Sequence, residues 1–455
     1  MRITTSRQDD KTYWWLLALA AAIIFEGAAR RWILPAALQP LAYISKDLIA
    51  LAFLYANRNR KYLPAPNILK VYCGILGVML IIPFVRGLEN HPIAAIITAK
   101  NALLWPLVAY RLSRVLVPND YTRLVTPWIS ILALQAVLGI IQYYSPQSSY
   151  VNKLAWDTPG LNIHSVTPTF GGNYGTRATG TFSFISGYTQ FAMYSALYFL
   201  YLLLYHRIAC GRTKVVAGLF LAIVCGVASG ARVFVAWLVV AFTVNALIGI
   251  KARALATTLV IFSCGAGVIY IGLSGVDDNI FSALLNRWRT SSDTTIERVT
   301  GTNIRGNFYE IVARQPLGAG LGSTHGLTAR DRMAEGDPRN IAYDDGGTNA
   351  IVESGLFGLF VLLTNIYLFA HFLHLSIFKL NKPFGQAGFV FGLLHLYAFC
   401  SVMWYDHVGT AIKCLCLGMW LGLWRYNSTE RLAVKNDFRE NVIRRKAHER
   451  ILQRR

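Results

Sequence analysis

The chain has 455 residues, of which 54% are hydrophobic and 15% are charged, and its mean hydropathy is +0.41. The apolar residues are gathered into runs too long for the core of a soluble domain, so a soluble globular protein is excluded. The formal net charge is +21, and its distribution along the chain decides whether nucleic acid or membrane topology explains it.

The apolar residues form twelve runs of roughly 15–22 residues, the length that crosses a bilayer. The polar N-terminus, Met1–Lys11, is too short and too polar for a cleaved signal peptide. We therefore predict an all-α polytopic membrane protein with about 12 transmembrane helices in a single domain, residues 1–424. The predicted spans lie near residues 14–29, 41–56, 68–85, 92–111, 124–144, 184–205, 215–229, 232–250, 255–274, 349–376, 385–404 and 408–424.

The positive charges indicate the orientation of these spans. If the N-terminus is cytoplasmic, every basic short loop falls on the cytoplasmic side, as the positive-inside rule requires. The tail, residues 425–455, has ten Lys and Arg against four Asp and Glu, and we predict that it is cytoplasmic and lies on anionic lipid. Two long loops, residues 145–183 and 275–348, then face outward, and no nucleic acid is needed to explain the charge. The basic short loops contain Arg58, Arg60 and Lys61; Arg111, Arg114 and Arg123; Arg207, Arg212 and Lys214; Lys251 and Arg253; and Lys379 and Lys382.

The cysteines predict neither a disulfide framework nor a metal site. Six of the seven lie in predicted spans and the seventh, Cys210, lies in a cytoplasmic loop. Neither outward loop has a cysteine, and no Cys/His spacing matches a zinc site. We therefore expect no metal and no cofactor.

Charged residues inside the first two spans predict ion pairs. Glu26 can pair with Lys46, and Arg30 or Arg31 with Asp47, because opposite charges on neighbouring spans offset the cost of burial. A direct contact between these residues and a substrate is the alternative interpretation.

Three other cations have no obvious partner in the sequence. Lys100 and Lys413 lie within predicted spans and are candidates for binding an anionic ligand. Arg232 ends the tight turn Ala228–Arg232 between two short spans, on the outward side. It either reaches lipid phosphate or binds an anionic ligand inside the bundle.

The first outward loop ends in a glycine-rich run around Arg177. The run Tyr174–Phe182 contains Gly175 and Gly180, and glycines let a backbone approach a ligand closely. Aromatic residues of this loop either stack on sugar rings or form an interfacial aromatic belt. They are Trp156, Phe170 and Tyr174.

The second outward loop carries eight arginines, ten carboxylates and no lysine. Guanidinium groups suit bidentate recognition of phosphate or carboxylate, whereas ion pairs within the loop are the alternative. Residues Thr295–Arg314 predict an amphipathic helix with Arg298, Arg305 and Arg314 on its polar face. The run Gln315–Gly322 is too rich in turns to be a long helix.

Three further residues of this loop are candidates for acid–base chemistry. His325 is a candidate base, although a lone histidine is more often structural. Asp344 and Asp345 can accept a proton, bind a divalent ion, or pair with arginine. The chain contains no Walker motif, no G-x-G-x-x-G after a strand and no G-x-S-x-G, so cytosolic nucleotide chemistry is unsupported. No clear inverted repeat of broken helices is visible, which weakens a transporter hypothesis.

The ordered set of these runs resembles the O-antigen ligase/polymerase superfamily over roughly residues 90–425. The runs are Arg177–Phe182, Ser229–Arg232, Arg298 followed by Pro316–Gly322, and Asn349–Gly358. The twelve spans, and the large outward loop between helices nine and ten, also fit the family.

The resemblance implies a metal-independent, inverting glycosyltransferase of the bacterial inner membrane that works on the periplasmic face. The donor would be a glycan on undecaprenyl diphosphate, and the acceptor another lipid-linked repeat unit (polymerase) or lipid A-core (ligase). Membrane lipids and a chain-length regulator are further candidate partners. Arg177, Arg232 and Arg298 would contact the diphosphate or the donor glycan, with Arg305 in reserve.

One position departs from the family pattern. Thr348 stands where the family usually has a histidine, and a threonine is no general base near neutral pH. Either His325 supplies the base, or Asp344 and Asp345 do, or the base is dispensable. This difference favours an exopolysaccharide or O-antigen polymerase over a ligase. A metal-dependent transferase that uses Asp344 and Asp345, and a non-enzymatic transporter of lipid-linked glycan, remain the alternatives.

Overall fold

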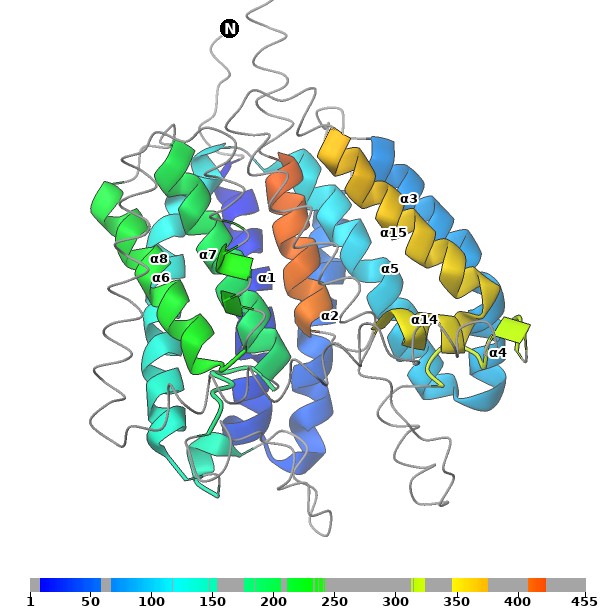
Figure 1. Cartoon of the computed structure of the whole chain (residues 1–455), viewed down its shortest axis with the longest axis horizontal. Coiled ribbons are helices and arrows are strands. Elements are labelled where there is room, and N and C mark those ends of the chain that lie inside the picture. The colour runs from blue at the N-terminus through cyan, green and yellow to red at the C-terminus, as the bar shows by residue number, and fades with distance from the viewer. Residues whose placement is uncertain are drawn as a thin grey trace, which may run out of the picture.

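The computed structural model describes residues 9–58, 67–116, 118–146, 148–153, 176–183, 185–205, 211–231, 346–374 and 408–422, with short pieces inside 234–241 and 312–323. These residues are helical almost throughout, and no β-strand is assigned among them (Figure 1). Within these ranges, three helices are long and apolar enough to cross a membrane, or four if one bent pair is a single span. The chain is therefore a helical membrane protein.

The first two predicted spans are confirmed as neighbouring helices. Helix α1 (Asp9–Ala28) continues into a π-helical turn, Ala29–Ile33. Helix α2 (Gln39–Ala56) begins with Pro40 in its first turn, where the missing N–H costs no helical hydrogen bond. The two helices pack against each other.

The third predicted span is bent in its middle. Helices α3 (Asn67–Met79) and α4 (Ile81–Asn90) meet at Leu80 with a bend of 43°. Helix α5 (Pro92–Val115) follows directly and packs against α2, α3 and α4.

Three further helices form the other side of the bundle (Figure 1). They are α6 (Pro118–Tyr144), α7 (Ile185–Tyr205) and α8 (Arg212–Ala228), and α8 packs against both α6 and α7. All three match predicted spans to within a few residues at most ends. Between α6 and α7 the structure describes a short 3₁₀ turn, Tyr150–Asn152, and the segment Thr176–Ser183.

The tenth predicted span is interrupted near its start. Helix α14 (Gly346–Ser354) and helix α15 (Leu356–His374) are separated by Gly355, whose φ is +57°. This left-handed conformation suits glycine and ends a helix. Helix α14 packs against α4, and α15 packs against α3.

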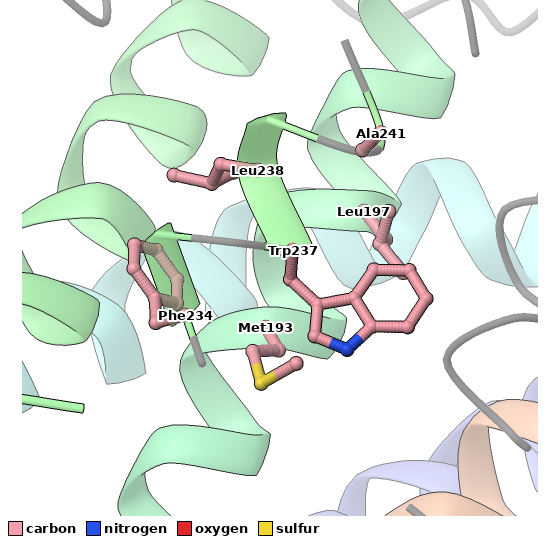
Figure 2. A pocket seen from close by; sticks show the side chains of 6 residues that line it. All are labelled: Met193, Leu197, Phe234, Trp237, Leu238 and Ala241. Carbon is pink, nitrogen blue, oxygen red and sulfur yellow. The ribbon is translucent and has the colours of Figure 1, made fainter. Parts of the chain in front are cut away.

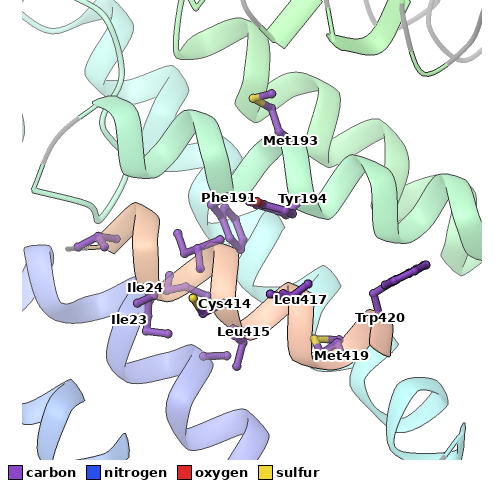
Figure 3. Close-up of a cluster of buried hydrophobic side chains, with 14 of the residues drawn as sticks. Ile23, Ile24, Phe191, Met193, Tyr194, Cys414, Leu415, Leu417, Met419 and Trp420 are labelled. Carbon is purple, nitrogen blue, oxygen red and sulfur yellow. The ribbon is translucent and has the colours of Figure 1, made fainter. Parts of the chain in front are cut away.

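The helix Val408–Gly422 lies at the centre of the apolar core. It runs between α1, which contributes Ile23 and Ile24, and α7, which contributes Phe191 and Tyr194 (Figure 3). A Cβ added to Gly418 would lie 2.8 Å from the Ala109 oxygen, so this helix also packs closely on α5.

Large apolar side chains are exposed on the outer faces of the bundle. On α2 they form a stripe with helical spacing, as expected for a helix that contacts lipid. The stripe consists of Leu41, Ile44, Leu48, Leu51 and Tyr55. The predicted spans 255–274 and 385–404, most of the two outward loops, and the tail 425–455 lie outside the described residues.

Candidate functional site

The segment Thr176–Ser183 is held between the ends of two helices. The Thr176 N–H donates to the Tyr143 oxygen at the end of α6 (3.2 Å), and the Ala178 N–H donates to the Ala228 oxygen at the end of α8 (3.1 Å). These two bonds fix the start of the glycine-rich run at one end of the bundle.

Two fully buried glutamines of α6 hold the middle of this segment. Gln142 Oε1 accepts the N–H groups of Thr179 (3.0 Å) and Gly180 (2.8 Å), and Gln135 Oε1 accepts that of Thr181 (3.0 Å). Gly180 has a φ of +55°, and a Cβ there would lie 2.2 Å from Gln135 Oε1. From the sequence, these glycines were predicted to let the backbone approach a ligand closely. At Gly180 the close approach is to the protein itself.

Arg177 joins two of the motifs found in the sequence. Its Nε donates to the Ser229 oxygen (2.9 Å), and its side chain is half-buried. Ser229 begins the turn after α8, where Gly230 has a φ of +60° and the Ser229 hydroxyl donates to the Gly226 oxygen (2.6 Å). The glycine-rich run and this turn, about fifty residues apart in sequence, therefore meet in space.

Arg31 also contacts the segment, although no sequence pattern had placed it in the site. The π-helical turn at the end of α1 carries it, and π-helical turns are frequent at functional sites. Its Nη1 donates to Thr179 Oγ1 (2.7 Å) and its Nη2 to the Gly180 oxygen (2.5 Å). The predicted pairing of Arg30 or Arg31 with Asp47 is wrong. The acceptors of Arg31 are neutral oxygens, and Asp47 pairs with Lys100 of α5.

A cluster of buried charges lies beside Arg31. Glu26 pairs with Lys46 (2.5 Å), as predicted, and also with Arg30 (3.1 Å). Asp47 pairs with Lys100 (2.5 Å), for which the sequence suggested no partner. This pair forms because α5 packs against α2. We call the following residues the cationic cluster: Arg30, Arg31, Lys46 and Lys100, with the carboxylates Glu26 and Asp47.

The run Gln315–Ser323 forms consecutive turns, as the sequence predicted, and packs between α4 and α14. The Leu321 N–H donates to the Pro83 oxygen (2.8 Å) on α4. The Gly322 N–H donates to Glu353 Oε1 (3.0 Å) on α14, and Glu353 is fully buried. Positive φ angles allow this path at Gly318, Gly320 and Gly322.

Most of the other predicted site residues lie outside the described part of the chain. Thr348 falls in α14, and its side chain is not described. Those outside are Arg232, Arg298, Arg305, His325, Asp344 and Asp345.

A small apolar cavity lies between α7 and residues 234–241 (Figure 2). Its lining offers one polar atom, the indole nitrogen of Trp237, so we assign it no chemistry. The lining residues are Met193, Leu197, Phe234, Trp237, Leu238 and Ala241.

No protein-family model matches the chain, and no curated protein matches it.

Proposed function

We propose that this protein is an inverting glycosyltransferase of the bacterial inner membrane. It polymerises undecaprenyl-diphosphate-linked repeat units of a surface polysaccharide on the periplasmic face. The proposal includes the twelve-span topology, with both termini cytoplasmic and the loops 145–183 and 275–348 periplasmic. The observation that carries it is the contact between Arg177 and the turn at Ser229.

This contact supports a site for a diphosphate. Arg232 follows Ala231 directly in the chain, so the turn that Arg177 binds is the turn that leads into a second arginine. Guanidinium groups bind phosphate oxygens through paired hydrogen bonds. Arg31 adds a third positive charge through its bonds to the same segment.

The proposed reaction is a single displacement at the anomeric carbon of the donor. The acceptor hydroxyl oxygen forms a bond to this carbon as the bond to the diphosphate oxygen breaks, and the configuration inverts. The hydroxyl proton passes to a base, for which His325, Asp344 and Asp345 remain the candidates. The electron pair leaves on the lipid diphosphate, where arginine stabilises the charge. One such contact contributes about 3 kcal/mol, or on the order of a hundredfold in rate.

The test is a reconstitution of the purified full-length protein with a lipid-diphosphate oligosaccharide and a chelator. We expect a ladder of longer lipid-linked glycans, and Arg177→Ala should slow its formation on the order of a hundredfold. Lys214→Ala is the matched control, because it removes an exposed cation from the opposite end of α8. A wild-type ladder from the Arg177→Ala protein would refute the assignment. A ladder only without chelator would indicate the metal-dependent variant.

The same reconstitution separates the polymerase from the ligase. If the lipid-linked donor alone gives no ladder but its glycan is transferred when lipid A-core is added, the protein is a ligase. This outcome would leave the assignment of Arg177 to the donor unchanged.

Transport of a lipid-linked glycan is the second candidate function, and the broken helices favour it. The sequence showed no clear repeat of broken helices, yet the described residues include one bent pair that can form a single span, α3/α4, and a second pair of helices, α14/α15, separated at Gly355. Transporter sites are often built on such interruptions. Movement of a fluorescent lipid-linked glycan across proteoliposomes, without a new glycosidic bond, would establish transport instead.

A further inference from the structure

Arg31 differs from the other cations of the cationic cluster. Each of the other three pairs with a carboxylate of the cluster. Arg31 is 3% exposed and forms no ion pair with any described residue. Its nitrogens donate instead to neutral oxygens of Gly27, Thr179 and Gly180. A buried charge is costly unless it is paired, and a neutral donor would satisfy the same oxygens, so stability alone does not explain a guanidinium here.

The guanidinium of Arg31 is held in one orientation. Its Nε donates to the Gly27 oxygen (3.3 Å) one turn back on α1, and its central carbon lies 4.4 Å from the centre of the Trp32 ring. This ring is itself fixed, because Trp32 Nε1 donates to the Tyr150 oxygen (3.1 Å) and the Tyr150 hydroxyl donates to the Trp32 oxygen (2.9 Å). The two terminal nitrogens then bond the segment as a planar fork, which fixes direction as well as distance.

Helix α1 also contacts the rest of the segment that carries Arg177. The Thr181 hydroxyl donates to the Ile24 oxygen (2.6 Å), and Gly27 leaves no space for a Cβ against the backbone of the segment. On the opposite side, Arg177 binds the turn after α8. The end of α1 therefore presses the segment toward α6 and α8, and Arg31 makes its two bonds only two and three residues after Arg177.

We infer that Arg31 is a positioning residue, which fixes the segment so that Arg177 has its binding orientation before the substrate arrives. The inference rests on the proposed function, in which Arg177 contacts the diphosphate. Arg31 itself does not reach the substrate, because it is buried and each of its nitrogens bonds to the protein. A donor that is already oriented needs no reorganisation during the reaction, and a misplacement of about 1 Å can cost on the order of a hundredfold in rate.

A double-mutant cycle of ladder formation by the purified full-length protein tests the inference. Arg31→Lys keeps the charge and most of the length of the side chain but replaces the fork with a single ammonium group, so the variant should fold. It should slow ladder formation on the order of tenfold while Arg177 is present. In the Arg177→Ala background the same change should alter the rate by less than about twofold, because the group that is positioned is gone.

Two results of the cycle would overturn the inference. Equal slowing in both backgrounds would do so, because a general loss of stability does not depend on Arg177. A wild-type rate from the Arg31→Lys protein would do so as well. Arg58→Lys is the matched control and should leave both rates unchanged. This arginine also stacks on an aromatic ring, that of Tyr55, but it is exposed and lies just beyond the end of α2.

Hydrogen exchange of the peptide 176–183, measured by mass spectrometry, gives a readout that does not depend on activity. Its amides should exchange on the order of tenfold faster in Arg31→Lys, the effect of losing about one hydrogen bond, and unchanged in Arg58→Lys. If the wild-type protein forms no ladder, the polymerase assignment fails, whereas faster exchange still supports the anchoring of the segment by Arg31. Unchanged exchange in Arg31→Lys overturns the inference whether or not a ladder forms.

Discussion

Gln142 is the residue of α6 whose loss should most directly free the segment that carries Arg177. We predict that Gln142→Met destabilises the protein by roughly 2–6 kcal/mol, because it removes one acceptor from two buried N–H groups and each costs about 1–3 kcal/mol when unpaired. These groups belong to Thr179 and Gly180, at 3.0 and 2.8 Å from Oε1. Methionine has a similar length and fills the space, so a cavity adds little.

The assay is unfolding in mixed micelles, followed by tryptophan fluorescence, together with the rate of ladder formation. We expect the rate to fall in the folded variant as well, because Arg177 loses the anchored segment that positions it. Ile141→Met is the matched control, since the neighbouring side chain is 47% exposed and should tolerate the change. A Gln142→Met protein within about 0.5 kcal/mol of wild type would refute the reasoning, because surface changes have effects of that size.

Two further predictions concern the packing between α4 and α14. Gly320→Ala should cost more than about 2 kcal/mol or prevent folding, because φ is +98° and the new Cβ would lie 2.7 Å from the Gly87 nitrogen. Size-exclusion chromatography tests whether the Gly320→Ala protein folds. Gly77→Ala is the control, because nothing lies within 4 Å of its added Cβ. Two monodisperse variants of equal stability would contradict the prediction. Glu353→Leu should cost about 1–3 kcal/mol by leaving the Gly322 N–H unpaired, whereas Glu353→Gln keeps an acceptor and should be nearly neutral. Equal unfolding midpoints for these two variants would show that this bond contributes little.

Most motifs of the site could be predicted from the sequence, but the contacts between them could not. The glycine-rich run around Arg177 and the turn at Ser229 were both recognised, yet their contact depends on where α6 and α8 end. Arg31 was missed as a contact of this run, because the π-helical turn that directs it leaves no pattern in the sequence. The glycines of Gln315–Ser323 predicted turns, but only the fold shows that these turns pack against Pro83 and Glu353.

The sequence by itself determined the helical membrane class and the approximate extents of α1, α2 and α5 to α8, because a bilayer admits only apolar segments of sufficient length with internally paired backbones. The pair between Glu26 and Lys46, which lie on consecutive helices, was also predicted from the sequence and is confirmed. The tertiary structure alone decided the breaks at Leu80 and Gly355 and the partner of Lys100. A helix break is stabilised by whatever packs against it, and at Gly355 the next N–H, that of Leu356, donates to the Pro316 oxygen (2.9 Å). An ion pair between α2 and α5 likewise depends on which helices become neighbours, and hydrophobic run length carries no information about that choice.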